Sequence, residues 1–392
     1  MKILIISYWF IPAKAIGARR WGEFYNLSLE DDEIEMTVLT ANWKGHNNDI
    51  NIHYIGDTIE DKPFFSLNKK VTFLDMLKHP SLMIRSIDHS LLKPWYKEVK
   101  IWLDKNSQNK YDMIISSFGP ISSVLLGNYA KNIYNKPHIV DLRDLISIQG
   151  QKSLFPIVHY LDKSIDKFIM KDVDKFMVVS PTGNRKATTF YKKEVTMIYN
   201  GLSCEINENE VDLTLLNKNK INILYMGTLG FNRNPSTILM ILNAYAKEYK
   251  ECEISVRFAS QDNPLDFIDN HKLQNIKVSW LGYLSKEELE IEKSNSDIFL
   301  LLEDLTERGN ENLTGKIFEY LNSKKPIMVS CHKNSDIVSL LKSTNAGSLV
   351  DTLSAFNKFL LEKRFLNIKE CNYYSRANQY KLLKEFIGIA DV

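Results

Sequence analysis

The chain has 392 residues, of which 44% are apolar and 25% are charged, and its formal net charge is +2 at pH 7. This length exceeds one ordinary hydrophobic core, so we expect two domains, and the near-neutral charge argues against a nucleic-acid partner. No apolar run approaches the roughly 20 residues that a membrane-spanning helix needs. The four widely spaced cysteines form no C-x-x-C pair, which indicates reduced thiols in a cytoplasmic protein.

Strand and helix signals alternate through the first half of the chain. Short apolar runs, typical of parallel strands that are buried on both faces, are each followed by a helical pattern. Strands are expected over 2–7, 35–41, 112–120, 137–142, 175–180 and 195–203. Helices are expected over 18–30, 121–134, 163–173 and 181–191. A repeated β-α-β pattern predicts a parallel sheet covered by helices.

A polar stretch over 204–220 reads as a linker, after which the same alternation starts again. Strands are expected over 221–227, 253–260, 276–282, 297–303 and 326–330. Helices are expected over 234–249, 285–295, 315–323 and 371–388. We therefore predict an α/β protein with two doubly wound parallel-sheet domains and a cleft between them. Ligands of such sheets bind beyond the carboxyl ends of the strands.

Two loops of the first half carry candidate residues. Gly17 precedes the helix over 18–30, where a glycine lets backbone approach a ligand; a turn glycine is the alternative. There is no G-x-G-x-x-G, and Arg19 and Arg20 are expected to be solvated. After the strand over 137–142, the D-x-R-D segment ends in Asp144, which could hold sugar hydroxyls or assist proton transfer. A structural ion pair within this segment is the alternative.

The second half offers a phosphate-binding loop and a helix start. Gly227 ends a strand, and Arg233 in the following loop suits bidentate contact with a phosphate, unless it is simply solvated. Thr314 and Gly315 lie at the start of the helix over 315–323, where backbone amides are free and Lys316 adds positive charge. The sequence therefore predicts an anion site there. An ordinary capped helix with an incidental Lys-Glu pair is the alternative.

Glu311 and Glu319 flank this helix start with seven residues between them. With the surrounding "TGKIFEYLNSKKPIM", this stretch resembles the donor-binding signature of glycosyltransferase family four. Other stretches resemble parts of the family in the same order: "ILIISYWFIPAKAIGARRW", "DMIISSFGP" with "IVDLRDL", "MIYNGL", "ILYMGTLGFNRNP", "VSWLGYLSKEEL" and "YYSRANQYKLLKEF". The resemblance extends over nearly the whole chain.

The resemblance implies a GT-B fold of two Rossmann-like domains. Residues 1–203 would form the acceptor-side domain, 204–369 the nucleotide-sugar domain, and 370–392 a helix that crosses back to the first domain. It further implies a retaining, metal-independent transfer of a sugar from a nucleotide-diphosphate sugar to a glycan or lipid-linked acceptor in bacterial surface polysaccharide biosynthesis. No cofactor is implied besides the donor substrate.

The resemblance also implies roles for single residues. Glu319 would hold the ribose hydroxyls, Glu311 would contact the donor sugar, and Asp144 would act on the acceptor side. Catalysis would depend on Glu311, Asp144 and Lys316. Donor binding would involve Gly17, Gly227, Arg233, Gly282, Tyr283, Thr314, Gly315, Lys316 and Glu319.

Two other functions stay open at this point. Asn312, Leu313 and Thr314 stand where the family often has Gly-Phe-Gly, which leaves room for a non-catalytic GT-B binding subunit. A nucleotide-sugar 2-epimerase of the same fold is the third possibility. Such an enzyme is expected to have more histidine and carboxylate side chains in the cleft, and this chain has only eight histidines in total.

The segment over 62–105 is basic and rich in aromatic residues. It contains Phe64, Phe65, Trp95, Tyr96 and Trp102. Such a composition suits a helix on the anionic inner leaflet, where a lipid-linked acceptor would lie. The alternative is a pair of ordinary amphipathic helices packed on the first domain.

Overall fold

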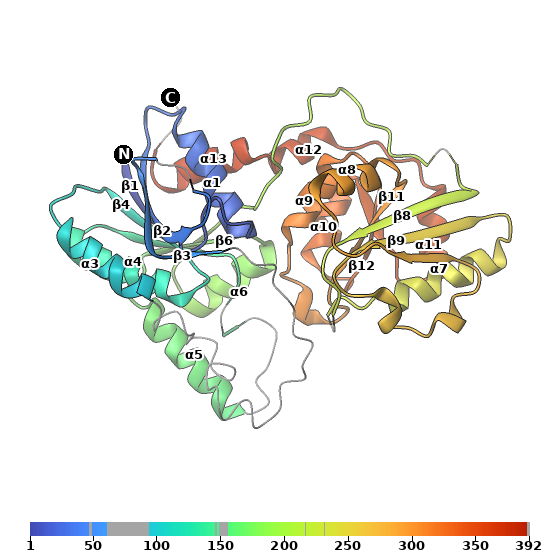
Figure 1. The fold of residues 1–392 in the computed structure, drawn as a ribbon, viewed down its shortest axis with the longest axis horizontal. Coiled ribbons are helices and arrows are strands. Elements are labelled where there is room, and N and C mark those ends of the chain that lie inside the picture. The colour runs from blue at the N-terminus through green and yellow to red at the C-terminus, as the bar shows by residue number, and fades with distance from the viewer. Residues whose placement is uncertain are drawn as a thin grey trace. The chain divides into compact units, whose positions relative to one another are not determined.

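A computed structural model describes residues 1–46, 49–60, 94–145, 147–148, 156–215, 217–230 and 232–389. The chain divides into two compact units, unit 1 of Met1–Tyr199 with Gln379–Val392, and unit 2 of Asn200–Asn378. Each unit contains a sheet of parallel strands covered by helices (Figure 1). The prediction of two parallel-sheet α/β domains is confirmed.

The described part of unit 1 contains a seven-stranded parallel sheet in the order β3-β2-β1-β4-β5-β6-β7. Its strands are β1 (Lys2–Ile6), β2 (Glu35–Trp43), β3 (Ile52–Ile59), β4 (Met113–Ser117), β5 (His138–Leu142), β6 (Lys175–Val178) and β7 (Glu194–Met197). The apolar run of β1 lies between β2 and β4, where Ile3 pairs with both Met36 and Met113. A central position buries both faces of a strand, which explains the continuous apolar sequence.

The helices of unit 1 bury its core on the sheet. Among the described residues they are α1 (Ile16–Ser28), α3 (Pro94–Lys105), α4 (Ile121–Tyr134), α5 (Pro156–Met170) and α6 (Pro181–Tyr191), with α13 (Arg376–Phe386) from the C-terminal part of the chain. Tyr380 and Leu383 of α13 pack in one hydrophobic cluster with Trp21 and Phe24 of α1. The residues from Gln379 onward thereby complete the core of unit 1.

Helix α3 belongs to the segment that we expected on a membrane surface. Its apolar residues Trp95, Val99 and Leu103 are buried in a core cluster with β1 and β2. Trp102 packs against His53, with ring centroids 4.8 Å apart. For 94–105 the alternative interpretation therefore holds, because the apolar face of α3 is used within unit 1. The remainder of the expected segment, 62–93, lies outside the described residues.

Arg20 corrects the expectation of a solvated helix face. Its side chain is completely buried, whereas its neighbour Arg19 is exposed. Arg20 Nε lies 3.3 Å from a carboxylate oxygen of Asp141, and its guanidinium also donates to the Tyr199 carbonyl. Trp21 Nε1 donates to the same carboxylate at 2.8 Å. A buried charge needs a partner of opposite sign, and Asp141 at the end of β5 supplies it.

His138 is a neutral histidine in the core of unit 1. One ring nitrogen lies 2.7 Å from Ser116 Oγ and the other 2.9 Å from Asn128 Oδ1. Burial lowers the pKa of His138 to about 3. An unfolded histidine has a pKa of about 6.5, so His138 contributes stability fully above that pH and loses it progressively towards pH 3.

We therefore expect the unfolding free energy of unit 1 to fall in acid by about 1.4 kcal/mol per pH unit more in the wild type than in a His138→Gln variant. Chemical denaturation between pH 6.5 and 4.5 measures this difference. The exposed His271 provides the control, because His271→Gln should leave the wild-type slope unchanged. Equal slopes in the wild type and His138→Gln would show that His138 is not held neutral.

The described part of unit 2 contains a six-stranded parallel sheet in the order β10-β9-β8-β11-β12-β13. Its strands are β8 (Lys220–Met226), β9 (Glu253–Ala259), β10 (Lys277–Trp280), β11 (Ile298–Leu302), β12 (Ile327–Ser330) and β13 (Gly347–Leu349). Its α-helices are α7 (Ser236–Glu248), α8 (Lys286–Ser294), α9 (Gly315–Asn322), α10 (Asp336–Thr344), α11 (Leu353–Leu361) and α12 (Ile368–Tyr373). Short 3-10 turns cover Pro264–Asp266, Asn270–Lys272 and Glu307–Gly309.

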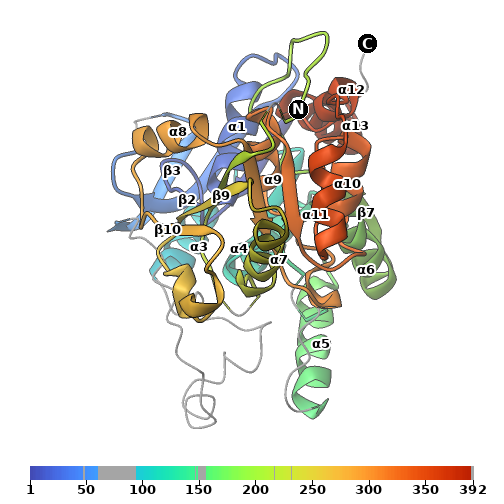
Figure 2. The same ribbon diagram turned by 90° about the vertical axis from the view of Figure 1, so that its right-hand side faces the viewer.

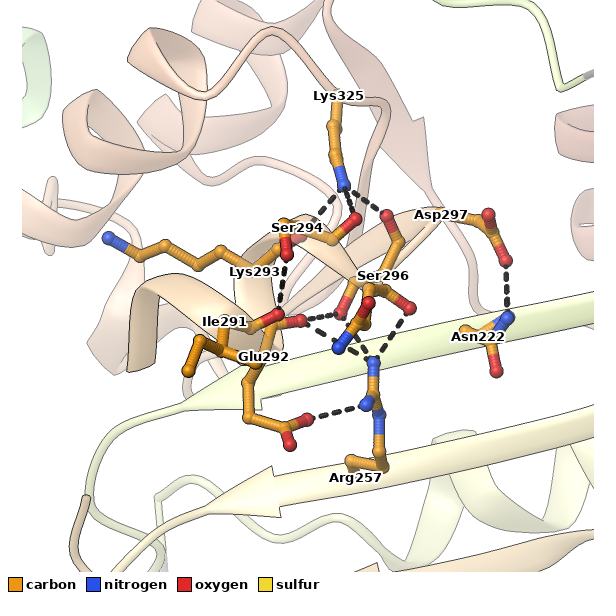
Figure 3. A network of polar contacts seen from close by, with 10 residues as sticks. Asn222, Arg257, Ile291, Glu292, Lys293, Ser294, Ser296, Asp297 and Lys325 are labelled. Atoms are coloured by element: carbon orange, nitrogen blue, oxygen red, sulfur yellow. Dashed lines mark hydrogen bonds and ion pairs between the residues drawn. The ribbon is translucent and has the colours of Figure 1, made fainter. Parts of the chain in front are cut away.

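A polar network fixes α8 against the sheet of unit 2 (Figure 3). Arg257 of β9 pairs with Glu292 of α8 at 2.5 Å and donates to the Asn295 carbonyl, just beyond the helix, at 2.8 Å. Lys325 donates to the Lys293 and Ser294 carbonyls at the end of α8, at 2.7 and 2.9 Å. A cation at a helix C-terminus satisfies free carbonyls and complements the dipole. We assign this network a structural role.

Candidate functional site

Three charged side chains converge at the carboxyl ends of β8 and β11 in unit 2. Arg233 lies in the loop that follows β8, Glu303 comes directly after β11, and Lys316 is in the first turn of α9. Parallel neighbouring strands place these loops at one edge of the sheet, since β8 and β11 are paired.

Arg233 is held by a buried carboxylate. Its Nη2 and Nε lie 3.0 and 3.1 Å from Glu303 Oε1, and its Nη1 donates to Thr228 Oγ1 at 3.3 Å. Burial opposes the charge of Arg233, but the Glu303 carboxylate outweighs this effect and raises the arginine pKa. The guanidinium is thus charged and oriented, with part of its charge already balanced by Glu303.

The Lys316 ammonium lies directly against the backbone of Gly227. A Cβ atom at position 227 would be 1.8 Å from Lys316 Nζ. Within the described ranges, this ammonium has no hydrogen-bond or ion-pair partner, and the ring of Tyr225 lies 5.8 Å away. Burial, assisted by repulsion from Arg233, lowers the pKa of Lys316 to about 8. An anion that approached this ammonium would replace its lost hydration.

The start of α9 presents free backbone donors beside Lys316. Thr314 is the N-cap residue, yet its side chain makes no capping bond and its Oγ1 is buried without a partner. No acidic residue lies in the first turn. Open amides at a helix N-terminus attract anions, and here the lysine adds a full positive charge. The arrangement can bind a phosphate or diphosphate group.

The other predicted residues of unit 2 take different positions. Glu319 is exposed on α9, one turn beyond Lys316. Glu311 is buried in the loop before α9. Gly282, with φ +72°, and Tyr283, which is 70% exposed, follow β10 at the far edge of the sheet. Gly227, Arg233 and Lys316 thus lie together at the carboxyl ends of β8 and β11. Thr314 and Gly315 begin the helix that contains Lys316.

Gly17, one of the predicted residues of unit 1, lies directly against Arg143. A Cβ atom at Gly17 would be 1.9 Å from Arg143 Nη1, so the glycine makes room for the guanidinium. Arg143 Nη2 donates to the Phe118 carbonyl at 2.9 Å. Asp141 pairs with Arg20 of α1, which lies outside the D-x-R-D segment, so an ion pair within that segment stays a prediction. Asp144 is exposed after β5, and its acceptor-side role stays a prediction.

The sequence analysis missed Glu303 and two tyrosines behind the site. Tyr320 donates to the Leu300 carbonyl at 3.2 Å and accepts from Met226 N–H at 3.2 Å, which links α9 to β8 and β11. Tyr225 is completely buried next to Lys316. Glu303 could have been found, because a carboxylate directly after the apolar run "IFLLL" marks the carboxyl end of a strand.

The described residues contain no group of three or more His, Cys, Asp and Glu side chains that could hold a metal ion. None of the helices in these ranges combines the length and the apolar character needed to cross a bilayer.

Substituting Gly227 is expected to disrupt the site. Gly227 has φ +139°, a conformation strained for other residues, and an added methyl group would strike the Lys316 ammonium. If the site binds a diphosphate, Gly227→Ala should therefore weaken diphosphate binding at least tenfold by displacing Lys316. Gly230→Ala, in the same loop, is the matched control, because no atom lies within 4 Å of the added carbon. Calorimetric titration of both variants measures the difference, and equal affinities would contradict the placement of Lys316.

Comparison with known proteins adds evidence on the fold. No protein-family model matches the chain, and no curated protein matches it in sequence. Solved structures do match along the whole length. The lipopolysaccharide outer core galactosyltransferase WaaB is 12% identical, with a TM-score of 0.60 and 99% of each chain covered. HepE from Anabaena, solved in complex with UDP, is 12% identical, with a TM-score of 0.57 and 100% of each chain covered.

A third similar structure is a UDP-GlcNAc 2-epimerase from Methanocaldococcus jannaschii. It is 13% identical, with a TM-score of 0.50, and the match covers 98% of this chain and 100% of the epimerase. Together with the two parallel-sheet units, these likenesses establish that the chain has the GT-B fold.

Proposed function

We propose that the chain is a retaining, metal-independent glycosyltransferase that moves a sugar from a nucleotide-diphosphate sugar to a glycan or lipid-linked acceptor. One observation carries the proposal: at the carboxyl ends of the unit 2 strands, the start of α9 has no side-chain cap, and the Lys316 ammonium beside it has no hydrogen-bond or ion-pair partner among the described residues. In a GT-B fold, a nucleoside diphosphate is an anion suited to this site. The structural likeness to WaaB supports the transferase reading.

The chemistry of the site suits departure of a nucleoside diphosphate. Negative charge grows on the leaving diphosphate as the bond to the sugar breaks. The positions of Lys316 and the first backbone amides of α9 are set before the ligand binds, so these groups stabilise the growing charge without reorganising. Arg233, oriented by Glu303, adds positive potential at the same edge. These groups take the charge-neutralising role that a divalent cation has in other transferases.

Six further residues have specific roles in the proposal. Glu319, exposed one turn beyond Lys316, accepts hydrogen bonds from the ribose hydroxyls. Glu311 contacts the donor sugar, and Asp144 of unit 1 acts on the acceptor side. Gly17, which makes room for the Arg143 guanidinium in unit 1, also belongs to the proposed donor-binding residues, and Gly282 and Tyr283 belong to the nucleotide-binding stretch after β10. The acceptor belongs to bacterial surface polysaccharide assembly, at the cytoplasmic face of the inner membrane.

A panel of nucleoside diphosphates, tested by thermal shift, examines the donor side. One member is expected to raise the melting temperature of the wild type, and Glu319→Ala should reduce the shift because the ribose contact is lost. Glu287→Ala changes an exposed carboxylate of α8 and serves as the control. If no diphosphate stabilises the wild type, the proposed donor site is wrong.

Two alternatives predict other products. A nucleotide-sugar 2-epimerase, supported by the likeness to such an enzyme, would return an epimerised nucleotide sugar without any acceptor. A non-catalytic binding subunit is favoured by the pairing of Arg233 with Glu303, which reduces the free positive charge of the site. Product analysis with the stabilising nucleotide sugar separates these cases: transfer or hydrolysis, epimerisation, or binding without turnover.

A further inference from the structure

Helix α5 of unit 1 exposes a row of apolar side chains, here called the apolar stripe, to solvent. Ile157, Tyr160, Leu161 and Phe168 are 76, 72, 47 and 68% exposed. Their spacing places them on one face of the helix. Both views show α5 extending away from the strands of its own sheet (Figures 1 and 2). A protein surface rarely concentrates exposed apolar side chains on one helix without a binding partner.

The opposite face of α5 buries carboxylates. Asp166 is completely buried and accepts hydrogen bonds from Ser147 N–H at 3.1 Å, Ser147 Oγ at 2.7 Å and Tyr191 OH at 2.9 Å. Asp162, one turn earlier, is also buried. Met170 at the end of the helix packs in the core. These anchors fix the rotation of α5 about its axis, so the outward position of the apolar stripe is built into the fold.

Basic side chains border the stripe. In α5 and in α6 beside it, every charged side chain that is not buried is basic: Lys163, Lys167, Arg185 and Lys186. A pocket of about 450 Å³ lies here, lined by Ile148, Lys167, Arg185, Lys186, Thr189 and Phe190. The surface thus pairs an apolar stripe with a basic pocket that is large enough for a lipid phosphate headgroup.

We propose that the exposed face of α5, with the basic pocket beside α6, docks on an anionic lipid bilayer. The apolar stripe enters the region between headgroups and acyl chains, and the pocket takes a lipid phosphate. An anionic bilayer satisfies both features, whereas a second copy of the chain would bring basic side chains against one another. The inference adds a membrane-docking surface to the unit that the proposed function assigns to the acceptor, and it rests on that function for its biological meaning. Vesicle binding needs neither donor nor acceptor, so the two can fail separately.

The test is flotation of the full chain with vesicles of phosphatidylcholine alone or with phosphatidylglycerol. The wild type is expected to float with the phosphatidylglycerol vesicles at low salt and to stay behind with phosphatidylcholine alone. An Ile157→Ser/Leu161→Ser double variant should bind on the order of tenfold more weakly, because it loses apolar burial. A Lys167→Glu/Arg185→Glu double variant should bind more weakly by a similar factor, since it loses attraction to the anionic lipid.

Ile291→Ser is the matched control, because Ile291 is 59% exposed on α8 of unit 2. It should float as the wild type does. The proposal is overturned if the wild type does not bind the anionic vesicles, or if both double variants bind as well as Ile291→Ser does. It is also overturned if gel filtration shows a wild-type dimer that Ile157→Ser/Leu161→Ser dissociates, since a second copy would then cover the stripe.

Discussion

Replacing Lys316 with methionine is expected to weaken nucleoside diphosphate binding by on the order of a hundredfold. A charge-assisted hydrogen bond to a phosphate contributes about 1.5–3 kcal/mol, and each 1.4 kcal/mol is a factor of ten in affinity. Methionine retains an unbranched side chain of similar length and removes a half-buried charge, so we expect the fold to survive. Calorimetric titration of the wild type and the variant with the stabilising diphosphate measures the change.

The control for this prediction is Lys333→Met, which removes an exposed lysine elsewhere in unit 2. It should leave the affinity within twofold of the wild type, because an exposed charge is screened by solvent and salt. A Lys316→Met protein that is folded and binds as tightly as Lys333→Met would remove Lys316 from the site.

Replacing Arg20 with alanine is expected to destabilise unit 1 by about 3–5 kcal/mol. Removing one partner of a buried ion pair leaves the other charge uncompensated in the interior, here the Asp141 carboxylate. The bond from the Arg20 guanidinium to the Tyr199 carbonyl is lost as well. Urea denaturation followed by circular dichroism measures the midpoint of the unit 1 transition.

Arg19→Ala provides a closely matched comparison, because Arg19 is the preceding residue of α1 but is exposed. Its effect should stay within about 0.5 kcal/mol, as for most surface substitutions. Similar losses for Arg19→Ala and Arg20→Ala would mean that the buried pair does not stabilise unit 1. Asp141→Asn should destabilise by a comparable amount to Arg20→Ala, since it leaves the arginine unpaired.

The central strands of the sheets could be predicted because the apolar pattern that marks each strand lies within its own short sequence. The run of β1 is apolar throughout, and the strand lies between two parallel neighbours. Strand β3 was missed: it is an edge strand, mostly half-buried, and Gly56 interrupts its pattern with φ +93°. An edge strand that packs on one side only lacks the continuous apolar run from which buried strands are recognised.

The helix start of α9 was also visible in the sequence, since Thr314, Gly315 and Lys316 are adjacent. The partners of the charged residues could not be predicted from the sequence. Arg20 is buried because Asp141, about 120 residues later, ends β5 directly beside it. Glu303 meets Arg233 because β8 and β11 are neighbours in the sheet. Such pairings depend on the order of the strands in the sheet, which local sequence periodicity does not predict.

The central claim, that the Lys316 ammonium binds a diphosphate, makes a specific prediction about protons. The pKa of Lys316 is about 8 in the free protein, and a bound anion raises it. Affinity should therefore be constant between about pH 7 and 8 and fall by up to tenfold per pH unit above pH 8, with proton uptake on binding. The phosphate groups themselves titrate near pH 6 and are fully ionised in this range.

Calorimetric titration between pH 7 and 9.5, in pairs of buffers with different ionisation enthalpies, measures this uptake directly. The account predicts proton uptake near pH 8.5 in the wild type and none in Lys316→Arg, whose guanidinium stays charged throughout. Wild-type binding without proton uptake and with a flat pH profile, or equal uptake in Lys316→Arg, would contradict it.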